Sequence, residues 1–114
     1  MRNAKFVATT VSKAIVDKEI RNCAFDVVIF DEASMATIPQ IAYAAKLARK
    51  NFVCMGDFRQ LPPIVQSSKE SPLNADIFQY CGITQAVDQG SNHKWLCLLD
   101  TQYRMHPEIA DFAG

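Results

Sequence analysis

Two adjacent carboxylates, Asp31 and Glu32, directly follow the apolar run VVIF. Carboxylates at the end of a buried strand are costly unless a cation or hydrogen-bond donors meet them. A magnesium–nucleotide complex would do so: Asp31 would hold the Mg²⁺ ion, usually through water, and Glu32 would orient and deprotonate an attacking water. The alternative is that the pair only caps a following helix, and the pair alone does not decide between these interpretations.

A glutamine, Gln60, follows the next apolar run in the segment Gly56–Pro63 (GDFRQLPP). Gly56 permits a tight turn, and the two prolines at the end of the segment stiffen the chain after it. The side chain of Gln60 offers both a donor and an acceptor, which suits a group that senses a terminal phosphate or an attacking water. An ordinary strand-to-helix turn explains the glycine and the prolines but not the glutamine.

A third polar group, Tyr103 and Arg104, lies in the segment Gln102–Pro107 (QYRMHP). An aromatic ring beside an arginine can stack on a base while the guanidinium binds a phosphate with two hydrogen bonds. Tyr–Arg pairs are also common on protein surfaces, so this pair by itself is weak support for a site.

Four short apolar runs must position these groups. They hardly alternate between apolar and polar residues, which is typical of strands that are covered on both faces. We therefore predict strands at Lys5–Thr9, Asp26–Phe30, Asn51–Met55 and Trp95–Leu99.

Helical patterns separate the four runs. We expect a helix over Lys13–Arg21 capped by Ser12, and a second one with Pro39 in its first turn and an apolar stripe that continues to Ala48. A third stripe is formed by Leu73, Ile77, Phe78 and Cys81 and ends at Gly82, and a last helix begins at Pro107.

The alternation of strands and helices predicts an α/β fold with a mainly parallel sheet flanked by helices on both faces. In such folds the chemistry gathers beyond the carboxyl ends of the strands. Because Asp31 and Glu32, Gln60, and Arg104 each follow a predicted strand, we expect them to converge around one triphosphate.

The composition is that of one soluble globular domain. The 114 residues are 49% hydrophobic and 21% charged, with a formal net charge of zero. This balance excludes a strongly cationic nucleic-acid coat but not a local basic groove. No apolar run approaches the roughly 20 residues of a membrane span, and the N-terminus lacks the pattern of a signal peptide. We expect a cytoplasmic protein, or a nuclear one if the source is eukaryotic.

The four cysteines are scattered, with no C-x-x-C pair. This spacing favours buried, reduced thiols over zinc ligands or disulfides.

Together the three segments resemble the first RecA-like motor domain of superfamily 1 helicases, in particular the Upf-like group. Asp31–Ser34 (DEAS) resembles motif II, or Walker B, of that family, Gly56–Pro63 resembles motif III, and Gln102–Pro107 resembles motif IV. The resemblance extends from Phe6 to the last predicted helix, and QYRMHP is its most specific part.

The resemblance implies a role for each matching residue, with ATP and Mg²⁺ as cofactors. Asp31 would coordinate the metal, and Glu32 would be the catalytic base. Gln60 would contact the γ-phosphate or the lytic water, Arg104 would contact the γ-phosphate, and Tyr103 would pack near the adenine. An arginine in that role contributes about 10³-fold or more to the rate.

The same resemblance implies single-stranded DNA or RNA as the partner and movement from 5′ to 3′. In the family, the segment that matches VATTVSKA touches the single-strand backbone. Thr10 and Ser12 would then donate hydrogen bonds to phosphates, with Lys13 nearby. Hydroxyls at such a turn more often cap helices, so this alternative stays open.

The sequence also departs from the family pattern. It has no G-x-x-x-x-G-K-[ST] motif, so the phosphate-binding loop, or Walker A, and its lysine are missing, as is the second RecA-like domain. The strand of that loop lies beside the motif III strand in RecA-type sheets, and its absence would leave a gap between the third and fourth strands predicted here. We therefore expect residues 1–114 to be a partial motor domain of a longer helicase and to bind ATP poorly alone.

Two other functions are compatible with parts of this pattern. A non-catalytic module that binds nucleic acid or a protein would explain the missing phosphate loop. A metal-dependent nuclease would use Asp31, Glu32 and Asp57, but it leaves Gln60 and the QYRMHP segment unexplained.

Overall fold

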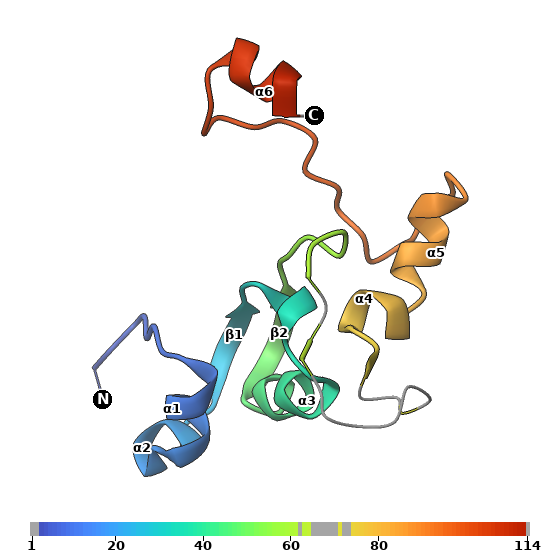
Figure 1. Ribbon diagram of the computed structural model, residues 1–114. Coiled ribbons are helices and arrows are strands. Elements are labelled where there is room, and N and C mark those ends of the chain that lie inside the picture. Colours follow the sequence, from blue (N-terminus) through green and yellow to red (C-terminus); the bar gives the residue numbers. More distant parts are fainter. Residues whose placement is uncertain (1–2, 62, 65–70, 72–73, 114) are drawn as a thin grey trace.

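The computed structural model describes residues 3–61, 63–64, 71 and 74–113, and in this part of the chain the sheet has two strands (Figure 1). Strand β1 (Phe25–Phe30) pairs in parallel with β2 (Ala48–Cys54), with Val28 opposite Phe52. Between them the chain forms a short 3₁₀ helix, η1 (Ala33–Met35), and then helix α3 (Ile38–Lys46). The α/β fold class with a parallel sheet flanked by helices is confirmed.

Helix α3 begins where the sequence predicts. Pro39 lies in its first turn, and the Oε1 atom of Gln40 accepts a hydrogen bond from the N–H of Thr37 at 2.9 Å, which satisfies a donor that has no partner within the helix. The helix ends at Lys46, earlier than the predicted stripe, because β2 starts directly afterwards. The N–H of Phe25 donates to the carbonyl of Leu47 at 2.8 Å, so strand pairing already operates there.

The main core lies between α3, the sheet and the segment after β1. Its buried members come from every one of these elements and from α4: Phe30, Ala33, Ala36, Ile41 and Phe78. The ring of Phe30 meets that of Phe52 edge-on at 6.5 Å between centroids, an arrangement that aromatic pairs favour.

One face of the sheet is covered and the other is open. Val28 and Phe52 face the helices, whereas Val27, Ile29 and Val53 are exposed. The prediction of strands covered on both faces is therefore wrong for the described part of the chain. The physical reason is that the helices that pack on the strands all cover the same face.

The first helical segment is divided in two. In place of one helix over Lys13–Arg21 there are α1 (Val11–Val16) and α2 (Lys18–Arg21). Asp17 causes the break, because its carboxylate accepts the N–H groups of Glu19 at 2.9 Å and Ile20 at 3.4 Å and so caps the second helix.

The cap of α1 is Thr10, not the predicted Ser12. The Oγ1 atom of Thr10 accepts the N–H of Lys13 at 3.2 Å, and Ser12 lies exposed within the first turn. Helices α1 and α3 are joined by the hydroxyl of Tyr43, which donates to the carbonyl of Ala14 at 3.1 Å.

Two predicted strands are not strands. Lys5–Thr9 and Trp95–Leu99 have irregular backbone, and Leu99 is 82% exposed. A strand is stable only when a neighbour satisfies its backbone groups. In the described part of the chain neither run has such a neighbour.

The chain after β2 forms three more helices: α4 (Ile77–Tyr80), α5 (Ile83–Asp88) and α6 (Pro107–Ala113). Gly82, with φ +73°, makes the left-handed turn between α4 and α5, and Pro107 opens α6 as predicted. Figure 1 shows an extended segment that leads from α5 to α6, away from the sheet. Leu73 and Pro62, which the sequence predictions used, lie outside the described residues.

All four cysteines are free, as predicted, but their burial differs from the prediction. Cys81 and Cys97 are exposed, and Cys23 and Cys54 are half-buried. Cys97 is exposed because its apolar run joins no sheet, and Cys81 because it follows the last turn of the short helix α4.

Cys54 is predicted to be the slowest thiol to alkylate. Burial raises its pKa, and the neighbouring Cys81 raises it further, so less of the reactive thiolate is present at a given pH. Labelling with iodoacetamide at about pH 8, followed by mass spectrometry of peptides, should modify Cys81 and Cys97 first. Denaturant should remove the difference. Equal rates for Cys54 and Cys97 in the folded chain would contradict the burial.

The same pKa shift has a defined sign for stability. The folded state keeps the Cys54 proton to a higher pH than the unfolded state does. The contribution of the Cys54 thiol to the free energy of unfolding is therefore complete below its unfolded-state pKa, and it is lost as the pH rises through the raised pKa of the folded state.

Candidate functional site

The turn after β1 holds the two adjacent carboxylates. The Oδ1 atom of Asp31 accepts the N–H of Glu32 at 2.9 Å, and both residues are exposed. Glu32 has φ 53° and ψ 41°, the single non-glycine residue with positive φ in the described part of the chain. The left-handed conformation is unfavourable for a side chain with a Cβ atom, and such strain is common at functional sites.

Two backbone hydrogen bonds fix this turn against the end of β2. The N–H of Met55 donates to the carbonyl of Phe30, and the N–H of Ala33 donates to the carbonyl of Met55, both at 2.8 Å. The pairing of the two strands thus continues past their ends. Consequently the turn that follows β1 and the backbone of Gly56 lie side by side at the carboxyl edge of the sheet.

Gly56 is where the two segments approach most closely. A Cβ atom at this position would lie 3.1 Å from the backbone nitrogen of Ala33 and 3.3 Å from that of Ser34. The φ of Gly56 is not positive, so the reason for glycine here is space and not backbone conformation.

The side chain of Gln60 is oriented by Asp57. The Nε2 atom of Gln60 donates to Oδ2 of Asp57 at 3.2 Å, and the N–H of Arg59 donates to Oδ1 of the same carboxylate at 3.0 Å. Sequence reasoning missed this role of Asp57. The sequence did contain a signal for it. Asp57 stands two residues before Arg59 and three before Gln60, so its carboxylate can accept hydrogen bonds from both, which is the pattern of an Asx-type turn.

Gln60 lines an open cavity of about 530 Å³ that extends to Met35. Its lining residues are Met35, Arg59, Gln60 and Leu61. Met35 belongs to η1, directly after Asp31–Ser34, so the cavity lies between the two segments.

The carboxylates of this edge have room for a cation. The ion pairs of the described residues are Lys50–Asp26 at 3.2 Å and Arg59–Asp88 at 3.8 Å, and neither involves Asp31 or Glu32. The described residues include no cluster of three or more His, Cys, Asp or Glu side chains that could hold a metal alone. An exposed Asp31 fits Mg²⁺, which keeps several waters and binds through one or two carboxylates and the phosphates of a substrate.

The structure does not bring Tyr103 and Arg104 to this edge. Gln102 closes a local loop around them, accepting the N–H of Met105 at 2.9 Å and donating to its carbonyl at 3.1 Å. Tyr103, which is 94% exposed, and Arg104, which is also exposed, lie on the segment that Figure 1 shows leading to α6. The expected convergence is absent here because Trp95–Leu99 joins no sheet, and the roles of Tyr103 and Arg104 stay predictions.

Thr10 and Ser12 lie at the start of α1. Thr10 caps that helix, which is the alternative left open by the sequence, and its contact with nucleic acid stays a prediction, as does that of Ser12.

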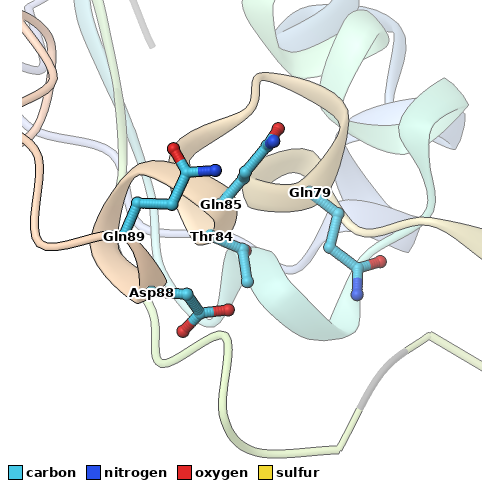
Figure 2. Close-up of a pocket in the computed structure, with 5 residues that line it drawn as sticks. All are labelled: Gln79, Thr84, Gln85, Asp88 and Gln89. Atoms are coloured by element: carbon cyan, nitrogen blue, oxygen red, sulfur yellow. The ribbon is translucent and has the colours of Figure 1, made fainter.

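A second cavity, of about 360 Å³, lies on α4 and α5 and contains none of the predicted site residues. It is lined mainly by amides: Gln79, Thr84, Gln85, Asp88 and Gln89 (Figure 2). Figure 2 shows Gln85 and Gln89 extending from the same side of α5, as residues four apart do. Asp88 links this region to the Gly56–Pro63 segment through its exposed ion pair with Arg59, which contributes little to stability.

Comparison with known proteins identifies the family of this chain. Residues 1–68 match the AAA domain family. Helicase sen1 of Schizosaccharomyces pombe is 36% identical over 88 residues, which are 77% of this chain and 5% of that protein. ATP-dependent helicase upf1 of the same organism is 31% identical over 98 residues, 84% of this chain and 10% of that protein.

This chain belongs to the Upf-like superfamily 1 helicases. A further relative, the probable helicase MAGATAMA 3 of Arabidopsis thaliana, is 37% identical over 117 residues, 98% of this chain and 13% of that protein. This chain therefore spans a small fraction of the length of these relatives. No solved structure matches it. Within the described residues, no helix is both long enough and apolar enough to cross a lipid bilayer.

Gly56→Ala is predicted to destabilise this helicase chain. The added Cβ would meet backbone atoms of Ala33 and Ser34, which cannot move without disturbing the hydrogen bonds beside them. Overpacking of this kind costs about 1–3 kcal/mol, which urea denaturation followed by circular dichroism can measure. An unchanged free energy of unfolding would show that the two segments are not packed as described.

Ser34→Ala is the matched variant in the same contact. The Oγ atom of Ser34 is buried without a hydrogen-bond partner among the described residues, and the residue is 1% exposed. Removing an unsatisfied buried hydroxyl should leave the free energy of unfolding unchanged or raise it. A loss as large as that of Gly56→Ala would mean that this hydroxyl has a partner.

Proposed function

We propose that this chain supplies part of the ATP-hydrolysing site of a nucleic-acid helicase or translocase and works with a phosphate-binding loop and a second motor domain in a longer polypeptide. The observation that supports it best is that the turn of Asp31 and Glu32 is hydrogen-bonded to Met55 at the end of β2, from which the segment of Gln60 follows. The relatives named above as helicases support the same reading.

Each residue has a distinct part in the proposed reaction. Asp31 would hold Mg²⁺ through its exposed carboxylate, and the ion would supply positive charge to the phosphate oxygens of ATP. Glu32 accepts a proton from the water that attacks the γ-phosphorus as the bond to the ADP oxygen breaks. Gln60, oriented by Asp57, hydrogen-bonds the attacking water or the γ-phosphate.

Arg104 supplies the remaining positive charge in this proposal, with Tyr103 beside the adenine. Enzymes of this type gain most of their rate by stabilising the charge on the transferring phosphoryl group. Because Arg104 is on a separate segment from the acid pair in this structure, the proposal requires the segment Gln102–Pro107 to approach the sheet edge in the complete motor.

Glu32→Gln tests the assignment of the base. In a helicase polypeptide that contains these residues and a phosphate-binding loop, the variant should lower kcat for ATP hydrolysis by about 10²-fold or more, since proton abstraction is lost. ATP binding should persist, because the amide keeps the shape of the carboxylate. Glu19→Gln, an exposed carboxylate on α2, is the control and should leave kcat unchanged. Normal turnover of Glu32→Gln would refute the assignment.

The isolated chain is predicted to bind ATP weakly. It has four glycines and no G-x-x-x-x-G-K-[ST] motif to surround the phosphates with backbone N–H groups. Isothermal titration calorimetry with Mg–ATP should detect no binding near about 1 µM, or about −8 kcal/mol. Binding at that level would require another phosphate site in these 114 residues.

A non-catalytic binding module is the second candidate. The course of the segment after α5, which Figure 1 shows leading away from the sheet, favours it, because neither ion pair of the described residues joins an arginine to Asp31 or Glu32. The variant Glu32→Gln distinguishes the two candidates. In the longer polypeptide it lowers kcat for ATP hydrolysis if Glu32 is the base, and it leaves kcat unchanged if this chain only binds.

A further inference from the structure

Strand β2 ends in a thiol on its core face, at Cys54. Phe52 and Cys54 pack on the main core, whereas Val53 and Met55 are exposed, which is the alternation of a strand. The pairing with β1 continues through Met55, so the chain returns to the core face at Gly56. Cys54 and Gly56 are therefore neighbours on the side of the sheet that the helices cover.

Helix α4 lies over this end of β2. A Cβ atom at Gly56 would lie 3.4 Å from Cε2 of Phe78, a side chain that is only 7% exposed. Cys81 follows three residues after Phe78, and its N–H donates to the carbonyl of Ile77 at 3.0 Å, so it continues the helical turn. Because residues three apart are neighbours on a helix, a second thiol lies at the edge of the helix face that covers β2.

The two thiols are close enough to influence each other. Burial raises the pKa of Cys54, and the charge of Cys81 raises it further, an effect that falls with distance. Cys54 is half-buried, whereas Cys81 is exposed. A dissolved oxidant therefore reaches Cys81 first, and Cys54 is the thiol placed to react with the product.

We propose that Cys54 and Cys81 are a reversible oxidation site, at which a hydroperoxide drives formation of a disulfide between β2 and α4. The Cys81 thiolate first attacks a peroxide oxygen: the S–O bond forms, the O–O bond breaks, and the leaving oxygen takes a proton. The Cys54 thiolate then attacks the sulfur of this sulfenic acid, so that the S–S bond forms and the hydroxyl leaves as water after taking a proton. The peroxide gains the two electrons that the sulfurs lose.

The disulfide would enclose the segment of Gln60 in a covalent loop, because Gln60 stands between the two cysteines in the chain. It would also fix α4 to the end of β2, and a dithiol reductant would release both by thiol–disulfide exchange. The inference does not depend on ATP hydrolysis, since it requires only the two thiols and the packing of α4 on β2.

Peptide mapping of the oxidised chain tests the pairing. The 114-residue chain is treated with hydrogen peroxide, its remaining thiols are blocked with N-ethylmaleimide, and the unreduced peptides are identified by mass spectrometry. We expect Cys54–Cys81 to be the main linked pair and dithiothreitol to remove it. A main pair of Cys81 with Cys97, linkage only between copies of the chain, or no linked peptide at all overturns the proposal.

Oxidation in urea shows whether the fold selects the pair. Cys81 is nearer in the chain to Cys97 than to Cys54, and closing a shorter loop costs less entropy in an unfolded chain. Urea should therefore shift the main pair to Cys81–Cys97. The same preference for Cys54–Cys81 in urea would mean that the packing of α4 on β2 does not cause it.

Variants separate the two steps. Cys54→Ser should abolish the internal disulfide and leave Cys81 as a sulfenic acid, which dimedone traps. Cys81→Ser should abolish the disulfide as well. Cys97→Ser, which removes another exposed thiol, is the matched control and should keep the yield of the Cys54–Cys81 link. Loss of the link in Cys97→Ser, or no trapped sulfenic acid at Cys81 in Cys54→Ser, contradicts this order of steps.

Hydrogen exchange shows whether the disulfide fixes α4. The N–H of Tyr80 donates to the carbonyl of Asp76 at 3.0 Å, so it exchanges when α4 opens. Its exchange should be slower in the oxidised chain than in the reduced one. The N–H of Ala110, which donates to the carbonyl of His106 in α6 at 3.0 Å, is the control and should exchange equally in both. Equal rates at Tyr80 would show that oxidation does not restrain the helix.

Discussion

The carboxyl edge of the sheet depends on the hydrogen bonds that continue the β1–β2 pairing beyond the strands themselves. Met55 bridges the two segments, donating to Phe30 and accepting from Ala33. Without these bonds the acid pair and the glutamine would be on two independent loops. The absence of a side chain at Gly56 lets the backbones approach closely enough for them to form.

The same edge combines strain with orientation. Glu32 adopts a left-handed backbone that an L-residue tolerates only where its surroundings determine it, and the hydrogen bond from its own N–H to Asp31 is part of those surroundings. Gln60 is held by Asp57. Asp31 thus fixes the backbone of Glu32, whereas Asp57 orients the side chain of Gln60, which therefore has less conformational entropy to lose when a ligand binds.

Sequence reasoning was reliable where local chemistry determines structure. Pro39 and Pro107 mark helix starts because proline is favoured in a first turn. The runs predicted as strands at Asp26–Phe30 and Asn51–Met55 largely coincide with β1 and β2, although β2 begins three residues earlier and ends at Cys54. It failed at Asp17, where an acidic residue inside an apparent helix caps a second one. The prediction failed there because the Asp17 side chain competes for backbone N–H groups, and the spacing of apolar residues does not reveal such competition.

Long-range pairing was the other source of error. Trp95–Leu99 is as apolar as β1, yet a run becomes a strand only when another strand satisfies its backbone. The position of Arg104 depends on that pairing, whereas the positions of Glu32 and Gln60 depend on bonds within the β1–β2 unit. This explains why half of the candidate site follows from the sequence and the other half does not.

The open face of the sheet has a practical consequence. Val27, Ile29 and Val53 are exposed on a two-stranded sheet whose outer edges have no partner strand among the described residues. Unpaired edges beside apolar surface are templates for association between copies of a chain. Preparations of these 114 residues should therefore become turbid as they are concentrated, and a fused solubilising partner or added charge on Val27 and Ile29 is the direct remedy.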